Sequence, residues 1–388
     1  MDTSHFSRRE FLSGIGASVF IPNKLVTWDE NEGDLKFVNL IDGDILHSGD
    51  GEVEDGKLFI EVIVAARRNS NIEINRVKAR FRDGLHTAVI ALSDYETDIV
   101  AIDKGTKRIA SIKVFWVPRL FNKYRLSIDD AIWFLRDLHA NADQYNSIFD
   151  TPFLGFMRSL HERYGTKVHI NLFYESDHFN LSQMTAKYKA EWKANSNWLR
   201  LSFHAWSEFP DNPYIHASYE KVKKDCSGVM EQIRRFAGEE VMGPVTTLHW
   251  GEVPVEVSRA LRDLGYVGQL CDFNVDNNLA PTSYYLDVEK RRHMNKRFVW
   301  RDNKEGISFI KSSIIIDTIK QENIETFLST YEKESRRPPY VDLLIHEQYF
   351  YPFYRSYQPN YRQKVEVAVK WAEAQGYSSA FLDECLFA

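Results

Sequence analysis

The sequence has few cysteines and no recognisable cysteine pattern. Cys226, Cys271 and Cys385 are the three cysteines of a 388-residue chain, and they form no Cys-x-x-Cys pair. The sequence therefore shows no disulfide framework, and its cysteine usage does not indicate a redox compartment.

Long apolar runs and dense positive charge are also missing. No stretch approaches the roughly 18 consecutive apolar residues of a membrane helix, so we expect no transmembrane segment. The formal net charge is −6 and no Lys/Arg stripe is present, so nucleic acid is not an expected partner. Aromatic residues, in contrast, make up 14% of the chain. They can fill a large core or stack on the apolar faces of sugars.

The length of the chain favours two domains, preceded by a short leader. Residues 1–28 include SRREFLSGIGASVFI, which resembles a twin-arginine export signal with a short apolar stretch. This similarity predicts a periplasmic or extracellular location. The acidic segment DENEGD at residues 29–34 is typical of a linker.

Two different patterns follow the linker. Residues 35–122 contain short Val/Ile-rich alternating runs separated by Gly, Asp and Asn, which predicts a small antiparallel β-sandwich. In residues 123–388 strand-like segments alternate with helical ones. That alternation predicts an α/β domain with a parallel sheet, either a barrel or a doubly wound sheet.

Polar side chains gather where the predicted parallel strands end, which is where such folds place functional residues. The predicted strand ends carry Asp129-Asp130, Asn171, Tyr174, His204, His249-Trp250, Asp272, Asp317, His346-Glu347 and Asp383-Glu384. Neighbouring strand residues point to opposite faces, so Asp129 and Asp130 can share a pocket only where the backbone leaves the strand. Carboxylates and histidines together are typical of a hydrolytic metal site, with one carboxylate on the metal and another acting as base.

The order of these motifs resembles that of the NodB-homology polysaccharide deacetylases, carbohydrate esterase family 4 and its relatives. That family has a distorted (β/α) barrel opening with an Asp-Asp motif, which SIDD matches. The resemblance implies Asp129 as the catalytic base and Asp130 as a metal ligand. It covers roughly residues 118–388, and LLIH matches its last motif, implying His346 as the general acid.

The second and third family motifs are altered in this chain. The family pattern His-x-x-x-His corresponds to HAWSE, so His204 takes the first position and Glu208 the second. His216 in DNPYIHAS is an alternative ligand, and His249 is a third candidate. The third motif falls at TLHWGEVPVEVSRALRDLGY, where its Arg and Pro-Tyr are absent and His249-Trp250 stand instead. The resemblance implies a divalent metal ion, with zinc expected.

Aromatic side chains flank the predicted acid. HEQYFYPFYRSYQPNY follows LLI directly, and Trp206 lies within HAWSE. The residues predicted to contact substrate are Trp206, His249, Trp250, Glu347, Tyr349 and Tyr351.

Three functions remain open. The leading hypothesis is an exported, metal-dependent hydrolase that removes N- or O-acetyl groups from a poly- or oligosaccharide. One alternative is a glycoside hydrolase using Asp129 with Glu347 or Glu384. The other is a sugar-binding protein that has lost its activity.

Overall fold

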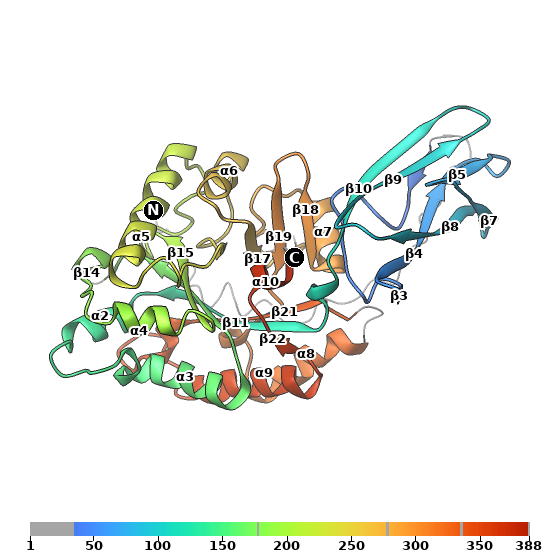
Figure 1. Cartoon of the computed structure of the whole chain (residues 1–388). Coiled ribbons are helices and arrows are strands. Elements are labelled where there is room, and N and C mark those ends of the chain that lie inside the picture. Colours follow the sequence, from blue (N-terminus) through green and yellow to red (C-terminus); the bar gives the residue numbers. More distant parts are fainter. Residues whose placement is uncertain (1–34, 177, 277–278, 334–336, 387–388) are drawn as a thin grey trace, which may run out of the picture.

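The computed structural model describes residues 35–176, 178–276, 279–333 and 337–386 (Figure 1). The predicted export signal at residues 1–28 and the linker at 29–34 lie outside these residues. Among the helices that the structure describes, none is long and apolar enough to cross a membrane.

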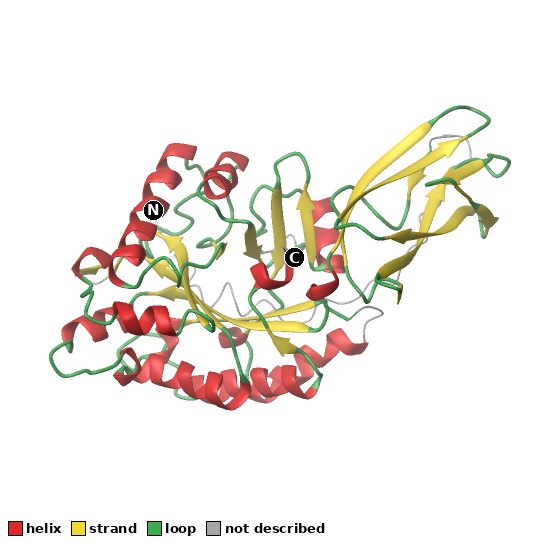
Figure 2. Ribbon diagram, viewed as in Figure 1, coloured by secondary structure: helices red, strands yellow, loops and turns green. Residues whose placement is uncertain are grey.

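The first part of the described chain consists of two five-stranded sheets (Figures 1 and 2). One has the order β1-β4-β8-β7 with β3 beside β4, and the other has the order β2-β10-β9-β5-β6. The strands are β1 (Lys36–Phe37), β2 (Ile45–Leu46), β3 (Glu52–Glu54), β4 (Lys57–Ala65), β5 (Ile72–Ile74), β6 (Val77–Lys78), β7 (Arg80–Arg82), β8 (Leu85–Leu92), β9 (Glu96–Asp103) and β10 (Ile109–Trp116).

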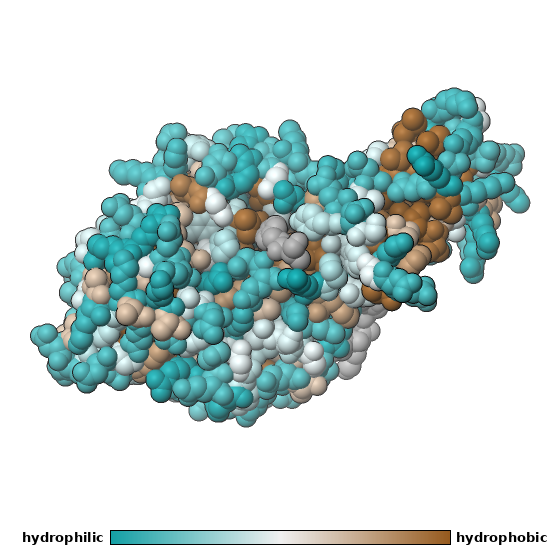
Figure 3. All heavy atoms as spheres, viewed as in Figure 1, coloured by the Kyte–Doolittle hydropathy of each residue, from teal (hydrophilic) through white to brown (hydrophobic). Residues whose placement is uncertain are grey.

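Alternating side chains build the core of this first part. In β4, Leu58, Ile60 and Val62 are buried while Lys57 and Glu61 face solvent, as expected for a strand with one solvent-exposed face. Apolar residues of both sheets form one buried cluster. The space-filling view shows apolar side chains at the surface of this part, whereas most of the remaining visible surface is polar (Figure 3).

The second part contains a six-stranded parallel sheet and a four-stranded sheet. The six-stranded sheet has the order β15-β12-β11-β21-β20, with β22 beside β11. The four-stranded sheet has the order β16-β17-β19-β18, in which only β18 runs antiparallel. The strands are β11 (Lys123–Ala131), β12 (Val168–Phe173), β13 (Glu175–Ser176), β14 (Phe179–Asn180), β15 (Leu199–Ala205), β16 (Val245–Thr247), β17 (Gly268–Cys271), β18 (Val299–Asp302), β19 (Ile307–Lys311), β20 (Ile314–Ile315), β21 (Tyr340–His346) and β22 (Ser378–Ser379).

The predicted distorted (β/α) barrel is not confirmed by this strand pairing. The two sheets are nevertheless linked at two places. On one side, Ser202 Oγ of β15 donates to the carbonyl oxygen of Val245 in β16, at 2.8 Å. On the other, the chain passes from β19 in one sheet to β20 in the other within a few residues. The parallel α/β architecture expected from the alternating pattern is therefore present as two linked sheets.

Helices cover the sheets. In Figures 1 and 2, α3, α8 and α9 run along the lower side of β11 and β21. The helices and 3-10 turns are η1 (Pro118–Leu120), α2 (Trp133–Ala140), η2 (Ile148–Asp150), α3 (Pro152–Tyr164), η3 (Leu181–Gln183), α4 (Lys189–Ala194), α5 (Tyr219–Phe236), α6 (Val255–Asp263), α7 (Val288–Arg297), η4 (Ile316–Thr318), η5 (Gln321–Asn323), α8 (Ile324–Lys333), η6 (Glu347–Phe350), α9 (Tyr361–Ala374) and α10 (Leu382–Leu386).

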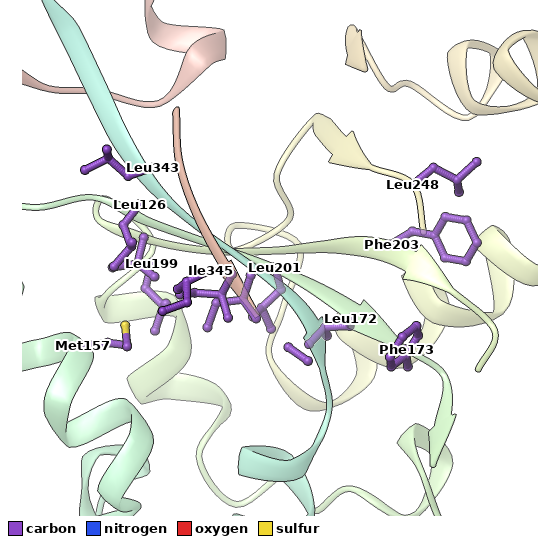
Figure 4. Close-up of a cluster of buried hydrophobic side chains, with 14 of the residues drawn as sticks. Leu126, Met157, Leu172, Phe173, Leu199, Leu201, Phe203, Leu248, Leu343 and Ile345 are labelled. Carbon is purple, nitrogen blue, oxygen red and sulfur yellow. The ribbon is translucent and has the colours of Figure 1, made fainter. Parts of the chain in front are cut away.

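Continuous apolar runs explain why the central strands are buried on both faces. Figure 4 shows Leu126 of β11, Leu172 of β12, Leu201 of β15 and Ile345 of β21 in one cluster. When helices cover both faces of a parallel sheet, each strand has a continuous run of apolar residues rather than an alternation of apolar and polar residues. One ion pair lies within this core, because Arg125 Nε is 2.8 Å from Asp342 Oδ1 and both side chains are fully buried. This rigid frame positions the strand ends described next.

Candidate metal centre

Asp129 and Asp130 lie where β11 leaves its regular geometry. The pairing of β11 with β12 shifts register between Ile128 and Ala131, and Asp130 has a left-handed backbone with φ of 56°. Successive side chains of a regular strand point alternately to the two faces of the sheet, and such an irregularity breaks this alternation. Both carboxylates are buried.

Asp130 lies between two histidines. Its Oδ1 is 2.9 Å from His204 Nε2 and 3.0 Å from His249 Nδ1. The two ring nitrogens are 3.2 Å apart. Within the described residues, this trio forms a group of ligand atoms close enough to hold one metal ion. All three side chains are buried.

The outer contacts of both histidines orient their inner nitrogens toward Asp130. His204 Nδ1 contacts the carbonyl oxygen of Thr247, and His249 Nε2 lies 3.1 Å from the carbonyl oxygen of Glu208. Because a carbonyl oxygen only accepts, each outer nitrogen carries a proton. The two inner nitrogens and a carboxylate oxygen converge at close range, an arrangement that a cation or a proton between them stabilises. Two imidazoles and one carboxylate fit a divalent metal ion such as zinc.

The third ligand differs from the first expectation. Neither the Glu208 carboxylate nor His216 belongs to the trio, and His216 is exposed. Glu208 instead contributes its carbonyl oxygen to His249, while its carboxylate lies 3.5 Å from the Tyr354 hydroxyl. His249, which the sequence offered as a third candidate and as a substrate contact, is instead the third member of the trio.

A sharp turn follows His249. Trp250 has a φ of 64° and Gly251 a φ of 57°. A Cβ at position 251 would lie 2.1 Å from Cys271 Sγ, so only glycine fits there. This turn sends Trp250 toward the pocket beside the trio.

Asp129, the predicted base, is held by a buried amide. Asn171 Nδ2 donates to Asp129 Oδ1 at 2.7 Å, and the backbone of Asp129 pairs with that of His346 between β11 and β21. Burial raises the pKa of Asp129, although His204 and His346 act in the opposite direction. The carboxylate is thus fixed beside the trio and faces the same pocket.

His346, the predicted acid, has a carboxylate partner that the motifs did not reveal. His346 Nδ1 lies 2.9 Å from Asp317 Oδ1, which also accepts from the backbone N–H of His346 at 3.2 Å. The carbonyl oxygen of Asp317 accepts from Gln358 Nε2 at 3.0 Å and from Lys364 Nζ at 3.2 Å. These contacts hold the imidazole through its Nδ1 side, which faces away from the pocket. Asp317 and Asn171 both lie at the ends of predicted strands. This position was the only feature of the sequence that pointed to a place in the site.

A pocket of about 80 Å³ opens beside these groups. One water molecule needs only about 10–15 Å³ of such space, so the pocket holds several ligand atoms. It is lined by Asp129, His204, Thr247, Leu248, Trp250, Cys271, Asp272, Asn274, Leu279, Ala280, Thr282, Ser312, Ile315, Leu344 and His346. Among the described residues, the hydroxyls of Thr247, Thr282 and Ser312 have no hydrogen-bond partner.

Several residues predicted to contact substrate are placed elsewhere. Glu347 is fully buried and accepts hydrogen bonds from the first turn of α2, so its carboxylate faces away from the pocket. Tyr349 is buried, and the hydroxyl of half-buried Tyr351 donates to Glu347 Oε1 at 2.7 Å. The Tyr351 ring packs edge-on against Trp133 of α2 with centroids 5.5 Å apart, whereas the Tyr349 ring packs edge-on against His346 at 5.9 Å. Trp206, half-buried, stacks on Tyr174 with ring centroids 3.9 Å apart.

Comparisons with known proteins give weak likenesses. No family model matches the chain, and no curated protein matches it. Among solved structures, the peptidoglycan N-acetylglucosamine deacetylase Bc1960 superposes with a TM-score of 0.36 at 10% identity, covering 69% of this chain and 90% of that one. The carbohydrate deacetylase Agd3 gives 0.37 at 10% identity, covering 84% and 64%. A Bacteroides ovatus GH5 xyloglucanase gives 0.26 at 10% identity, covering 88% and 100%. Likenesses at this level do not establish a family, so the function is inferred from the site itself.

Proposed function

We propose that this protein is a metal-dependent hydrolase that removes acetyl groups from a carbohydrate. The observation that carries the proposal is the convergence of five side chains: Asp130, His204 and His249 as a ligand set, with Asp129 and His346 beside it. A base and an acid flanking a metal centre are what hydrolysis of an amide or ester requires. Export, a distorted (β/α) barrel and the domain boundaries at residues 35, 122 and 123 stay predictions of the sequence.

The ligand set would hold a divalent ion, with zinc expected. Asp130 Oδ1, His204 Nε2 and His249 Nδ1 would bind it, and the outer contacts of the two imidazoles hold the rings in the required orientation. When bound, such an ion polarises a carbonyl oxygen and lowers the pKa of water.

The remaining groups move protons. Asp129 takes the proton of the attacking water, and Asn171 keeps its carboxylate in place. His346 gives a proton to the leaving amine or alkoxide, while Asp317 holds Nδ1 so that Nε2 is the nitrogen left for the substrate. Asp317 also stabilises the imidazolium form that must exist before this transfer.

The pocket supports a carbohydrate as substrate. Its walls combine apolar side chains such as Leu248 and Ile315 with the unpartnered hydroxyls of Thr247 and Ser312. Isolated buried hydroxyls cost free energy unless a ligand or water satisfies them, and a sugar ring offers both apolar faces and hydroxyl groups. Trp206 and Trp250 remain the proposed stacking residues.

The glycosidase alternative is less well supported. The Glu347 carboxylate is engaged by α2, and Glu384 Oε1 lies 2.6 Å from Lys167 Nζ at an exposed position. Neither is placed to pair with Asp129 across a glycosidic bond.

Product analysis tests the proposal. The full chain loaded with zinc is incubated with a panel of N- and O-acetylated oligosaccharides, with and without a chelator. Acetate release that stops with the chelator and returns with zinc is expected. Release of shorter sugars in the presence of the chelator, or binding without any product, would favour one of the two alternatives instead.

A further inference from the structure

Glu347 occupies an unusual position directly after His346. Its side chain is fully buried, and both carboxylate oxygens accept hydrogen bonds. Oε2 accepts from the backbone N–H of Ile132 at 2.6 Å and of Trp133 at 2.9 Å. Oε1 accepts from the N–H of Phe134 at 2.6 Å and from the Tyr351 hydroxyl at 2.7 Å. Four donors therefore surround one carboxylate in the interior.

Three of these four donors are the N–H groups at the start of α2. A helix leaves its first N–H groups without intrahelical partners, and a polar side chain at the position before the helix usually satisfies one of them. Here Ile132 occupies that position and provides no side-chain cap. Glu347, more than 200 positions later in the chain, supplies the missing acceptor.

The capped turn directly follows Asp130 in the chain and so affects its backbone conformation. Only Ala131 separates Asp130 from Ile132. Before the turn, the chain is held by the pairing of Ile128 with Ile345 and of Asp129 with His346. After it, the chain is held by Glu347. Asp130 itself has the left-handed φ of 56°, a conformation that costs a non-glycine residue free energy and persists only where its surroundings impose it.

We propose that Glu347 is a positioning residue of the metal centre. By fixing the backbone from Ile132 to Phe134, it imposes the conformation that brings Asp130 Oδ1 to His204 and His249. The inference rests on the proposed function in taking the trio as the metal site, but it concerns binding of the ion rather than turnover.

The test is a metal titration of the full chain. The protein is freed of metal with a chelator and titrated with Co²⁺, whose visible absorption reports both affinity and ligand geometry. Wild type is compared with Glu347→Gln, which keeps the shape but places an amide NH₂ against N–H donors. We expect Co²⁺ affinity to fall about 10- to 100-fold, the range typical of residues that orient metal ligands. An altered Co²⁺ spectrum is also expected.

Glu191→Gln is the matched control. Glu191 is another carboxylate that accepts from a backbone N–H, that of Ile148 at 2.8 Å, and from a hydroxyl, that of Ser147 at 2.6 Å. It belongs to α4 and is not part of the trio. This control should lower the melting temperature without changing Co²⁺ affinity by more than about twofold.

The outcomes are distinct. A Glu347→Gln protein that melts earlier but binds Co²⁺ with wild-type affinity and spectrum would show that Glu347 only stabilises the fold. If that variant does not fold, Glu347→Asp, which keeps the charge but shortens the side chain, takes its place with the same expectation and the same contrary result. If wild type itself does not bind Co²⁺ at the trio, the metal centre of the proposed function fails, and this positioning role fails with it.

Discussion

At the scale of single residues, the site depends on how two adjacent carboxylates come to act differently. Asp130 is turned by its left-handed backbone onto His204 and His249. Asp129 is held by Asn171 and faces the pocket without joining the ligand trio. In the proposed function, this division makes Asp130 the metal ligand and Asp129 the group that takes the proton of water.

Replacing the base separates these two roles. Asp129→Asn keeps the size of the side chain and leaves the ligand trio intact. Because the amide cannot take a proton from water, we expect kcat for acetate release to fall about 10²- to 10⁴-fold. The bound-metal content should stay at the wild-type level. A variant that keeps its turnover would remove Asp129 from the mechanism.

At the scale of elements, β11 and β21 form the frame that brings acid and base together. Seven consecutive residues of β11 pair with β21, from Lys123 with Tyr340 to Asp129 with His346. Within this pair, Arg125 and Asp342 form the buried ion pair, and Arg125 Nη2 also lies 3.4 Å from Ser127 Oγ.

Breaking that ion pair should cost much stability. Arg125→Met leaves the Asp342 carboxylate buried and uncompensated, so we expect the free energy of unfolding to drop by about 3–5 kcal/mol in urea denaturation. Adding Asp342→Leu should restore much of the loss, since no charge then remains buried. Arg163→Met is the control, because its pair with Glu366 is partly exposed and worth less than about 1 kcal/mol. Equal losses for Arg125→Met and Arg163→Met would contradict this account.

The sequence predicted these elements better than their mutual contacts. Alternating and continuous apolar runs indicated the strands, and the position of SIDD and LLIH at strand ends indicated Asp129, Asp130 and His346. The choice among Glu208, His216 and His249 could not be made from spacing. It depends on β16 lying beside β15, where the N–H of His249 donates to the carbonyl oxygen of His204 at 3.1 Å. The burial of Glu347 likewise depends on α2 packing against a segment distant in sequence.

At the scale of the whole molecule, buried charges join the first part of the chain to the second. Asp44, close to β2, lies 3.7 Å from Arg297 Nε of α7 and also contacts His293. Arg297 Nη1 is 2.9 Å from Asp50 Oδ1. Apolar residues of both parts, including Phe115 and Leu270, pack around this junction.

This junction should make stability depend on acid pH. Burial alone would raise the pKa of Asp44, but Arg297 and His293 outweigh burial and hold it below its ordinary value. A lowered carboxyl pKa stabilises the fold fully above the ordinary value near 3.9, and this contribution is lost as the pH falls through the lowered pKa. Wild type should therefore exceed Asp44→Asn in unfolding free energy at pH 7, and the difference should shrink below about pH 4. A difference that does not change with pH would contradict this assignment.

The central claim is that Asp130, His204 and His249 hold one divalent ion. The most direct measurement is the metal content per chain of purified wild type, His249→Ala and His216→Ala after zinc loading and removal of free metal. We predict about one ion per chain in wild type and His216→Ala, and almost none in His249→Ala. Full occupancy in His249→Ala with loss in His216→Ala, or no bound metal in wild type, would contradict the account.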